Sequence, residues 1–214
     1  FFQEVYHVNL NTLETRDSRD MSNTDRVFFL DQMTKALYGI IYFSNDADKQ
    51  VATQQFLQSL EMLEDHIDMQ RSENLVYVNH KRAILHGSLA LNHLSRADGS
   101  AAVEEAAKAV QLMELLLRHV DRSAADFPGF VLEYIESAST LGKAYRHGGE
   151  NSQALEWVQV ALTNAEVLYA NYAGEGRVIA RSLADLHLLE ASLLESLLLR
   201  EGAMESLESA RRVF

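Results

Sequence analysis

The eight histidines are the residues of this sequence best suited to chemistry, because imidazole binds metal ions and transfers protons near neutral pH. His80, His86 and His93 fall in one stretch, six and seven positions apart. A helical metal site needs two ligands one turn apart, at i and i+4, and no histidine pair has that spacing. His86 and His93 share a helix face, but no carboxylate stands at ligand spacing beside them. The pattern predicts no metal site.

Patterns for covalent catalysis and phosphate binding are equally weak. A catalytic serine normally sits at a sharp turn such as Gly-x-Ser-x-Gly, and the sequence has no such element. Gly174-Glu175-Gly176 lacks the preceding strand and the Lys-Ser/Thr ending of a phosphate loop, so it is predicted to be a turn between helices. We expect no catalytic residues, no cofactor, and a protein that is not an enzyme.

Charge gives the first indication of a binding role. The formal net charge of -12 opposes nucleic acid and anionic membranes, which attract Lys and Arg clusters, and favours a basic protein partner. Glu61, Glu64, Asp65 and Asp68 are predicted to lie on one side of a helix, opposite Leu60, Leu63 and Ile67. A solvated face is the simpler interpretation of this acidic run, and contact with a basic protein is the alternative.

The elements that must position these residues are helices. From Val27 to Ile41, apolar residues recur at spacings of three and four, as one face of a helix requires. The same periodicity predicts helices near residues 24–43, 48–70, 74–96, 100–121, 130–147, 151–172 and 177–200, with a last one from about 203. A single proline, Pro128, is placed to open the helix that follows it.

Short turns and an internal repeat predict how these helices pack. Turns at 44–47, 98–100, 148–151 and 201–202 are short enough to force antiparallel hairpins. Ala52, Phe56 and Ser59 recur as Ala102, Ala106 and Ala109, then as Ala154, Val158 and Ala161, with a weaker echo at Leu207, Arg211 and Phe214. Small side chains at this spacing let two helices approach closely. We therefore predict an all-α fold, a right-handed α-solenoid of tetratricopeptide-like antiparallel hairpins with about eight to nine helices; an ordinary amphipathic bundle is the alternative.

Domain organisation and location follow from the same features. Residues 1–214 are expected to form a single helical domain, a fragment of a longer chain because the sequence starts without methionine and inside a helical pattern. No apolar run is long enough to cross a bilayer. The absence of cysteine suits a reducing compartment, so we expect a cytoplasmic protein.

Partner contacts are expected on the helix of the clearest repeat, Leu141-Gly142-Lys143-Ala144-Tyr145. Lys143, Arg146 and His147 fall on its polar side, with Glu136 two turns before Lys143. In solenoids that side lines the concave surface, so these four residues are the candidate partner-binding residues. Trp157, among Ala154, Val158 and Ala161, is expected to pack in or between hairpins rather than stack on a ligand.

Several segments resemble a known family. Phe1-Phe2-Gln3, Ala36-Leu37-Tyr38-Gly39-Ile40-Ile41-Tyr42-Phe43 and Leu75-Val76-Tyr77-Val78-Asn79-His80-Lys81-Arg82 are similar to the C-terminal half of the KIF-binding protein family, tetratricopeptide-like proteins that bind kinesin motors. Residues 138–145 and 154–162 match its last hairpins, so the resemblance spans nearly the whole chain. It implies a cytoplasmic, cytoskeleton-associated protein that grips kinesin motor domains and keeps them off microtubules. The alternative is a generic scaffold or regulatory domain, such as the tail of a bacterial kinase or transcription activator.

Overall fold

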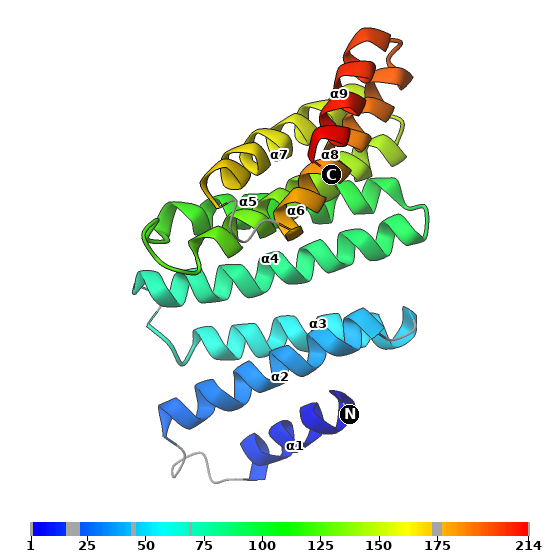
Figure 1. Ribbon diagram of the computed structural model, residues 1–214. Coiled ribbons are helices and arrows are strands. Elements are labelled where there is room, and N and C mark those ends of the chain that lie inside the picture. The colour runs from blue at the N-terminus through cyan, green and yellow to red at the C-terminus, as the bar shows by residue number, and fades with distance from the viewer. Residues whose placement is uncertain (1, 16–21, 44–45, 69, 173–176, 214) are drawn as a thin grey trace. The chain divides into compact units, whose positions relative to one another are not determined.

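The computed structural model describes residues 2–15, 22–43, 46–68, 70–172 and 177–213, and this part of the chain contains nine α-helices and no strand (Figure 1). The helices are α1 (Phe2–Thr15), α2 (Asn23–Phe43), α3 (Asp46–Glu64), α4 (Ser72–Ser95), α5 (Gly99–His119), α6 (Phe127–His147), α7 (Asn151–Asn171), α8 (Arg177–Ser196) and α9 (Arg200–Val213). The predicted all-α fold of helical hairpins is confirmed, since the helices pack in adjacent pairs.

The chain forms two compact units, Phe1–Val78 and Asn79–Phe214, and the boundary between them falls inside α4. In the first unit, α2 packs against both α1 and α3. Its core includes Leu30, Leu37, Phe56 and Leu60, each at most 1% exposed. Burial of such side chains contributes about 1.5–3 kcal/mol each, and this stabilises the contact between α2 and α3.

The second unit carries the candidate site. Each helix from α5 to α9 packs against its neighbour in the chain, and α6 also contacts α8 directly. The contact between α6 and α7 is close because Gly142 faces α7 without a side chain. A Cβ at that position would lie 2.8 Å from Cγ2 of Val158 and 3.2 Å from the carbonyl oxygen of Ala154. Ala154, Val158 and Ala161 are fully buried, so the predicted seam of small residues is present.

Three hairpin turns of this unit share one backbone geometry. Ala97, Gly149 and Leu198 each adopt a left-handed conformation, with φ of 61°, 81° and 63°, and lie 52 and 49 residues apart. The next residue in each turn donates its N–H back across the helix end, as in Asp98 N to His93 O at 3.0 Å, Glu150 N to Tyr145 O at 2.9 Å and Leu199 N to Leu194 O at 2.8 Å. This is the Schellman ending of a helix, which satisfies carbonyls left without intrahelical partners.

The shared turn fixes the register of the internal repeat. Ala102, Ala154 and Ala203 each follow the left-handed residue by five positions, and each is at most 7% exposed. The expected fourth copy at Leu207, Arg211 and Phe214 is therefore wrong by four residues: Arg211 is exposed and Phe214 lies outside the described residues. Leu207 corresponds instead to Val158, and because no further helix of the described chain covers it, it is 44% exposed.

The end of α3 also differs from the prediction. The helix was expected to reach residue 70 but ends at Glu64, so Asp65 and Asp68 lie in the following turn rather than on a helical acidic face. The reason is local hydrogen bonding: His66 N bonds to Leu63 O, and the Asp68 carboxylate accepts the N–H of Gln70 at 3.0 Å. Aspartate competes with the helix in this way wherever its side chain can reach a nearby N–H. Glu61, Asp65 and Asp68 are exposed, as a solvated acidic run requires.

The other predicted boundaries agree within three residues, apart from the end of α8, which was expected at residue 200 and lies at Ser196. Pro128 lies in the first turn of α6, as predicted, where its missing N–H costs nothing. None of the described helices is long and apolar enough to cross a membrane. The predicted turn at Gly174-Glu175-Gly176 lies outside the described residues.

Candidate functional site

One face of α6 presents charged side chains that the fold itself does not use. Glu136, Lys143 and His147 are exposed and share this face, because seven and eleven residues correspond to about two and three helical turns. Within the described residues, none of these three side chains has a hydrogen-bond or ion-pair partner. Arg146 lies at the edge of the face and donates from Nη2 to Ser192 Oγ of α8 at 2.8 Å. All four predicted contact residues are thus brought to one side of α6.

Two clefts open along this face. The first, here called the α6 cleft, has a volume of about 390 Å³ and is bounded by α4, α6 and α8. Its lining residues are Leu91, Ile135, Glu136, Ser139, Thr140, Lys143, Ser182, Asp185 and Leu186. The second has a volume of about 450 Å³ and is lined by Leu94, Lys143, Arg146 and His147. Lys143 belongs to both, so the two clefts adjoin.

The carboxylate of Glu136 lies in an environment that disfavours its negative charge. Partial burial raises its pKa above the ordinary glutamate value, and the nearby charge of Glu133 raises it further, while Lys143 acts in the opposite direction. Asp185 adds a second carboxylate to the same cleft, and Arg181 lies 4.0 Å from it. A cation that entered the cleft would relieve the repulsion at Glu136.

Glu133 is held at the side of the cleft by a residue of α4. His80 Nε2 pairs with the Glu133 carboxylate, and the His80 ring packs edge-on against Phe130 with 5.1 Å between ring centroids. Both partners of His80 come from α6. The contact therefore joins α4 to α6 beside the cleft and fixes where Glu133 stands.

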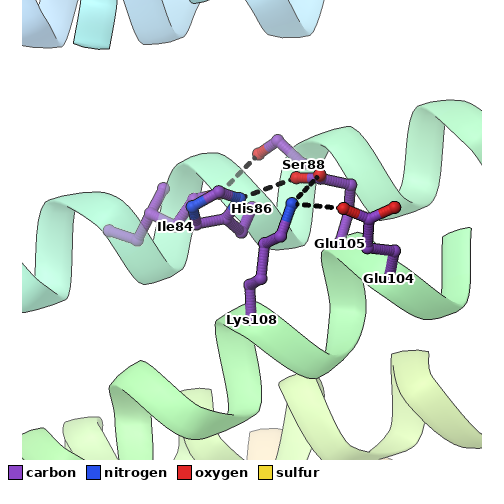
Figure 2. Close-up of polar contacts among 6 residues, drawn as sticks. All are labelled: Ile84, His86, Ser88, Glu104, Glu105 and Lys108. Carbon is purple, nitrogen blue, oxygen red and sulfur yellow. Dashed lines mark hydrogen bonds and ion pairs between the residues drawn. The ribbon is translucent and has the colours of Figure 1, made fainter. Parts of the chain in front are cut away.

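A second polar cluster joins α4 to α5, and Figure 2 shows it. His86 Nδ1 lies 2.6 Å from Oε2 of Glu105, and Lys108 Nζ donates to Oε1 of both Glu105 and Glu104 at 2.8 Å. Burial alone would raise the pKa of Glu105, but the hydrogen bonds and charges of Lys108 and His86 outweigh it and hold the pKa below its usual value. The cluster is a clamp between helices, since Glu105 is only 15% exposed and cannot reach a ligand easily.

The remaining histidine of the predicted stretch completes this pattern. His93 Nδ1 lies 3.6 Å from Asp98 Oδ2 in the turn between α4 and α5. His80, His86 and His93 thus face three different carboxylates, from α6, from α5 and from the turn. Two of these carboxylates, Glu133 and Glu105, are distant in the sequence from the histidines they contact. In the described part of the chain, no three His, Cys, Asp or Glu side chains gather as a metal would need.

The four residues predicted on α6 line the two clefts, but the residues that line the α6 cleft from α4 and α8 were not predicted. Asp185 and Ser182 of α8 and Leu91 of α4 were not identified, although the repeat register contains a signal for them. Glu136 and Asp185 both precede the left-handed turn residue of their hairpin by 13 positions. Lys143 and Leu91 likewise precede theirs by six. Trp157, expected in or between hairpins, is partly exposed on α7.

The function of this chain is inferred from the geometry of the site. No model of a protein family matches the sequence, and no curated protein matches it. The α6 cleft combines three properties that recognition needs, namely a hollow, charges that the described structure leaves without partners, and apolar side chains in its lining.

Proposed function

We propose that this chain is a protein-binding module whose partner occupies the face of α6 between α4 and α8. The observation that carries the proposal is the pair Glu136 and Lys143, which line the α6 cleft and have no side-chain partner among the described residues. A charged side chain that forms no hydrogen bond or ion pair within the fold remains available to a partner. Repeat proteins use the inner faces of their hairpins in this way.

A protein is a better partner for this cleft than a nucleic acid or a membrane surface. The cleft offers a carboxylate and an ammonium together with Leu91 and Leu186. Nucleic acids and anionic membranes present negative charge only, and the net charge of -12 repels both. A protein segment presents both charges and an apolar side chain within a short distance.

The kinesin motor domain is the specific candidate partner. Two features support it: the resemblance of the N-terminal and α4 segments to the KIF-binding protein family, and the acidic balance of the chain, which suits a basic surface. In this proposal the chain holds a motor domain in the cytoplasm and reduces its attachment to microtubules. The broader proposal, a scaffold or regulatory domain of a larger protein, needs only the cleft and does not depend on the resemblance.

The test compares three forms of the chain as bait: the unaltered chain, Lys143→Glu and Arg122→Glu. Both variants change the charge by the same amount, but Arg122 is an exposed turn residue that lines neither cleft. We expect a partner to bind the unaltered chain and Arg122→Glu, and to bind Lys143→Glu at least several-fold more weakly. Equal binding to all three forms would remove the α6 cleft as the binding site.

A panel of purified kinesin motor domains tests the specific candidate with the same three baits. We expect at least one motor domain to bind and to lose microtubule attachment when the chain is added in excess. If no motor domain binds, the kinesin proposal fails, and the broader proposal is then judged by the Lys143→Glu comparison with whatever partner is found.

A further inference from the structure

The α6 cleft is electrically polarised along the helix axis. Glu136 and Lys143 both line the cleft from α6, and Arg146 and His147 continue from Lys143 into the adjoining cleft. Glu136 and Lys143 are seven residues apart on one helix, so their Cα atoms are separated by about 10.5 Å along the axis. A partner that satisfies both charges must itself carry two opposite charges at about that separation.

Three apolar and three hydroxyl side chains make up the uncharged part of the cleft lining. Ile135 is 1% exposed and Leu186 is 3% exposed, while Leu91 forms a rim that is 49% exposed. Ser139, Thr140 and Ser182 complete the lining, and the Thr140 hydroxyl already donates to the Glu136 carbonyl at 2.8 Å. Such a lining favours an aliphatic side chain between the two charged groups of the partner.

The separation of the charges discriminates between an extended and a helical partner. An extended chain rises about 3.3 Å per residue, so it covers 10.5 Å in about three residues, and residues i and i+3 of a strand point to opposite sides. Both charges could not then reach α6. In a helix, residues i and i+7 are about 10.5 Å apart on the same face, and residue i+4 lies between them on that face.

We propose, on the basis of the proposed function above, that the α6 cleft binds an amphipathic helix that presents a basic residue to Glu136, an aliphatic residue to Leu91 and Leu186, and an acidic residue to Lys143. The partner helix therefore carries opposite charges at i and i+7 with the aliphatic residue at i+4 or i+3. The raised pKa of Glu136 supports this arrangement, because a cation beside Glu136 offsets both the desolvation of its carboxylate and the repulsion from Glu133. Lys143 gains a counter-charge in the same step.

The experiment uses three synthetic helical peptides that differ only at two positions. All have leucine at i+4; the first has lysine at i and glutamate at i+7, the second has lysine at both, and the third has glutamate at both. Binding is measured by fluorescence anisotropy to the full chain and to its Glu136→Lys and Lys143→Glu variants. Both substituted positions are exposed, so the variants should unfold at nearly the same temperature as the unaltered chain.

The proposal predicts a change of preference and not merely a loss of binding. The unaltered chain should bind the mixed-charge peptide about fivefold more tightly than either other peptide, a ratio on the order of one exposed ion pair. Glu136→Lys should prefer the peptide with two glutamates, and Lys143→Glu the peptide with two lysines. A matched peptide with the charges at i and i+5, which lie on different faces, should bind more weakly than the mixed-charge peptide.

Two results would overturn the inference. One is no measurable binding of the mixed-charge peptide to the unaltered chain at about 1 mM, the weak end of specific recognition. The other is an unchanged order of preference in both variants. Either result leaves the proposed function to its own test, because a protein partner that distinguishes Lys143→Glu from Arg122→Glu would still place an interface at the cleft, though with a different kind of segment.

Discussion

The close approach of α6 and α7 gives a prediction whose size can be worked out from the structure. Replacing Gly142 by alanine removes the conformational cost of glycine in a helix, which stabilises the protein by about 0.5–1 kcal/mol. The new methyl carbon, however, would lie 2.8 Å from Val158 Cγ2 and 3.2 Å from the backbone oxygen of Ala154. Moving α7 away to accommodate it costs about 1–3 kcal/mol, as in other overpacked cores. We expect a net loss of stability.

Gly87 provides a matched control for the same chemical change. It also lies inside a helix, α4, but a Cβ there would meet no atom within 4 Å. Gly87→Ala should therefore show only the helix gain of about 0.5–1 kcal/mol. The difference between the two substitutions isolates the cost of the contact, about 1–3 kcal/mol, or on the order of 2–12 °C in Tm for a chain of this size.

Chemical and thermal unfolding followed by circular dichroism measure both variants. Val158→Ala in the Gly142→Ala background removes the methyl group that clashes, so the double variant should lose less stability than the two single variants together. Indistinguishable effects of Gly142→Ala and Gly87→Ala would refute the reasoning, as would strict additivity with Val158→Ala. Either result would mean that α6 and α7 are farther apart than described.

Two further predictions concern the hairpin turn and the α4–α5 clamp. Leu198 is in the left-handed region and 81% exposed, so Leu198→Gly should remove a backbone cost of about 1 kcal/mol and raise Tm, whereas Leu199→Gly at the following residue should not; a fall in Tm for Leu198→Gly would contradict this. The pKa of Glu105 is lower in the folded protein than its usual 4.5, so its contribution to stability is complete above that value and disappears as the pH falls through the lower folded pKa. Glu105→Gln should therefore lower the unfolding free energy at neutral pH, and below pH 4.5 the unfolding free energy of the variant should fall less steeply than that of the unaltered chain. An equally steep fall in both proteins would contradict the role assigned to Glu105.

Local periodicity was sufficient to predict the helices, because each helix from α2 to α9 carries its own apolar face. It could not place the end of α3, where Asp68 accepts an N–H from Gln70 and interrupts a pattern that continues in the sequence. It also misplaced the last copy of the repeat, because burial of Ala203 and Ala210 depends on the backbone geometry at Leu198. A leucine gives no sequence signal for a left-handed residue, unlike Gly149 in the equivalent turn.

The candidate residues of α6 could be identified because they lie on one helix at helical spacing. Their surroundings could not be predicted, since the other lining residues, Leu91 of α4 and Asp185 of α8, are distant in the sequence and only the three-dimensional fold brings them to the same cleft as Glu136. The histidine partners illustrate the same limit. Glu133 and Glu105 lie 53 and 19 residues from the histidines they contact, so no spacing rule along a single helix reveals them.

The way α4, α6 and α8 line the cleft also has a mechanical consequence. α6 contacts α4 through His80 and Glu133 and contacts α8 directly, while α5 and α7 join these helices in chain order. The distance between Leu91 of α4 and Leu186 of α8 therefore depends on a series of helix contacts. A partner side chain held between Leu91 and Leu186 connects the two walls directly and bypasses that series. A bound partner segment should therefore make the second unit more resistant to bending, because it holds α4 and α8 at a fixed separation.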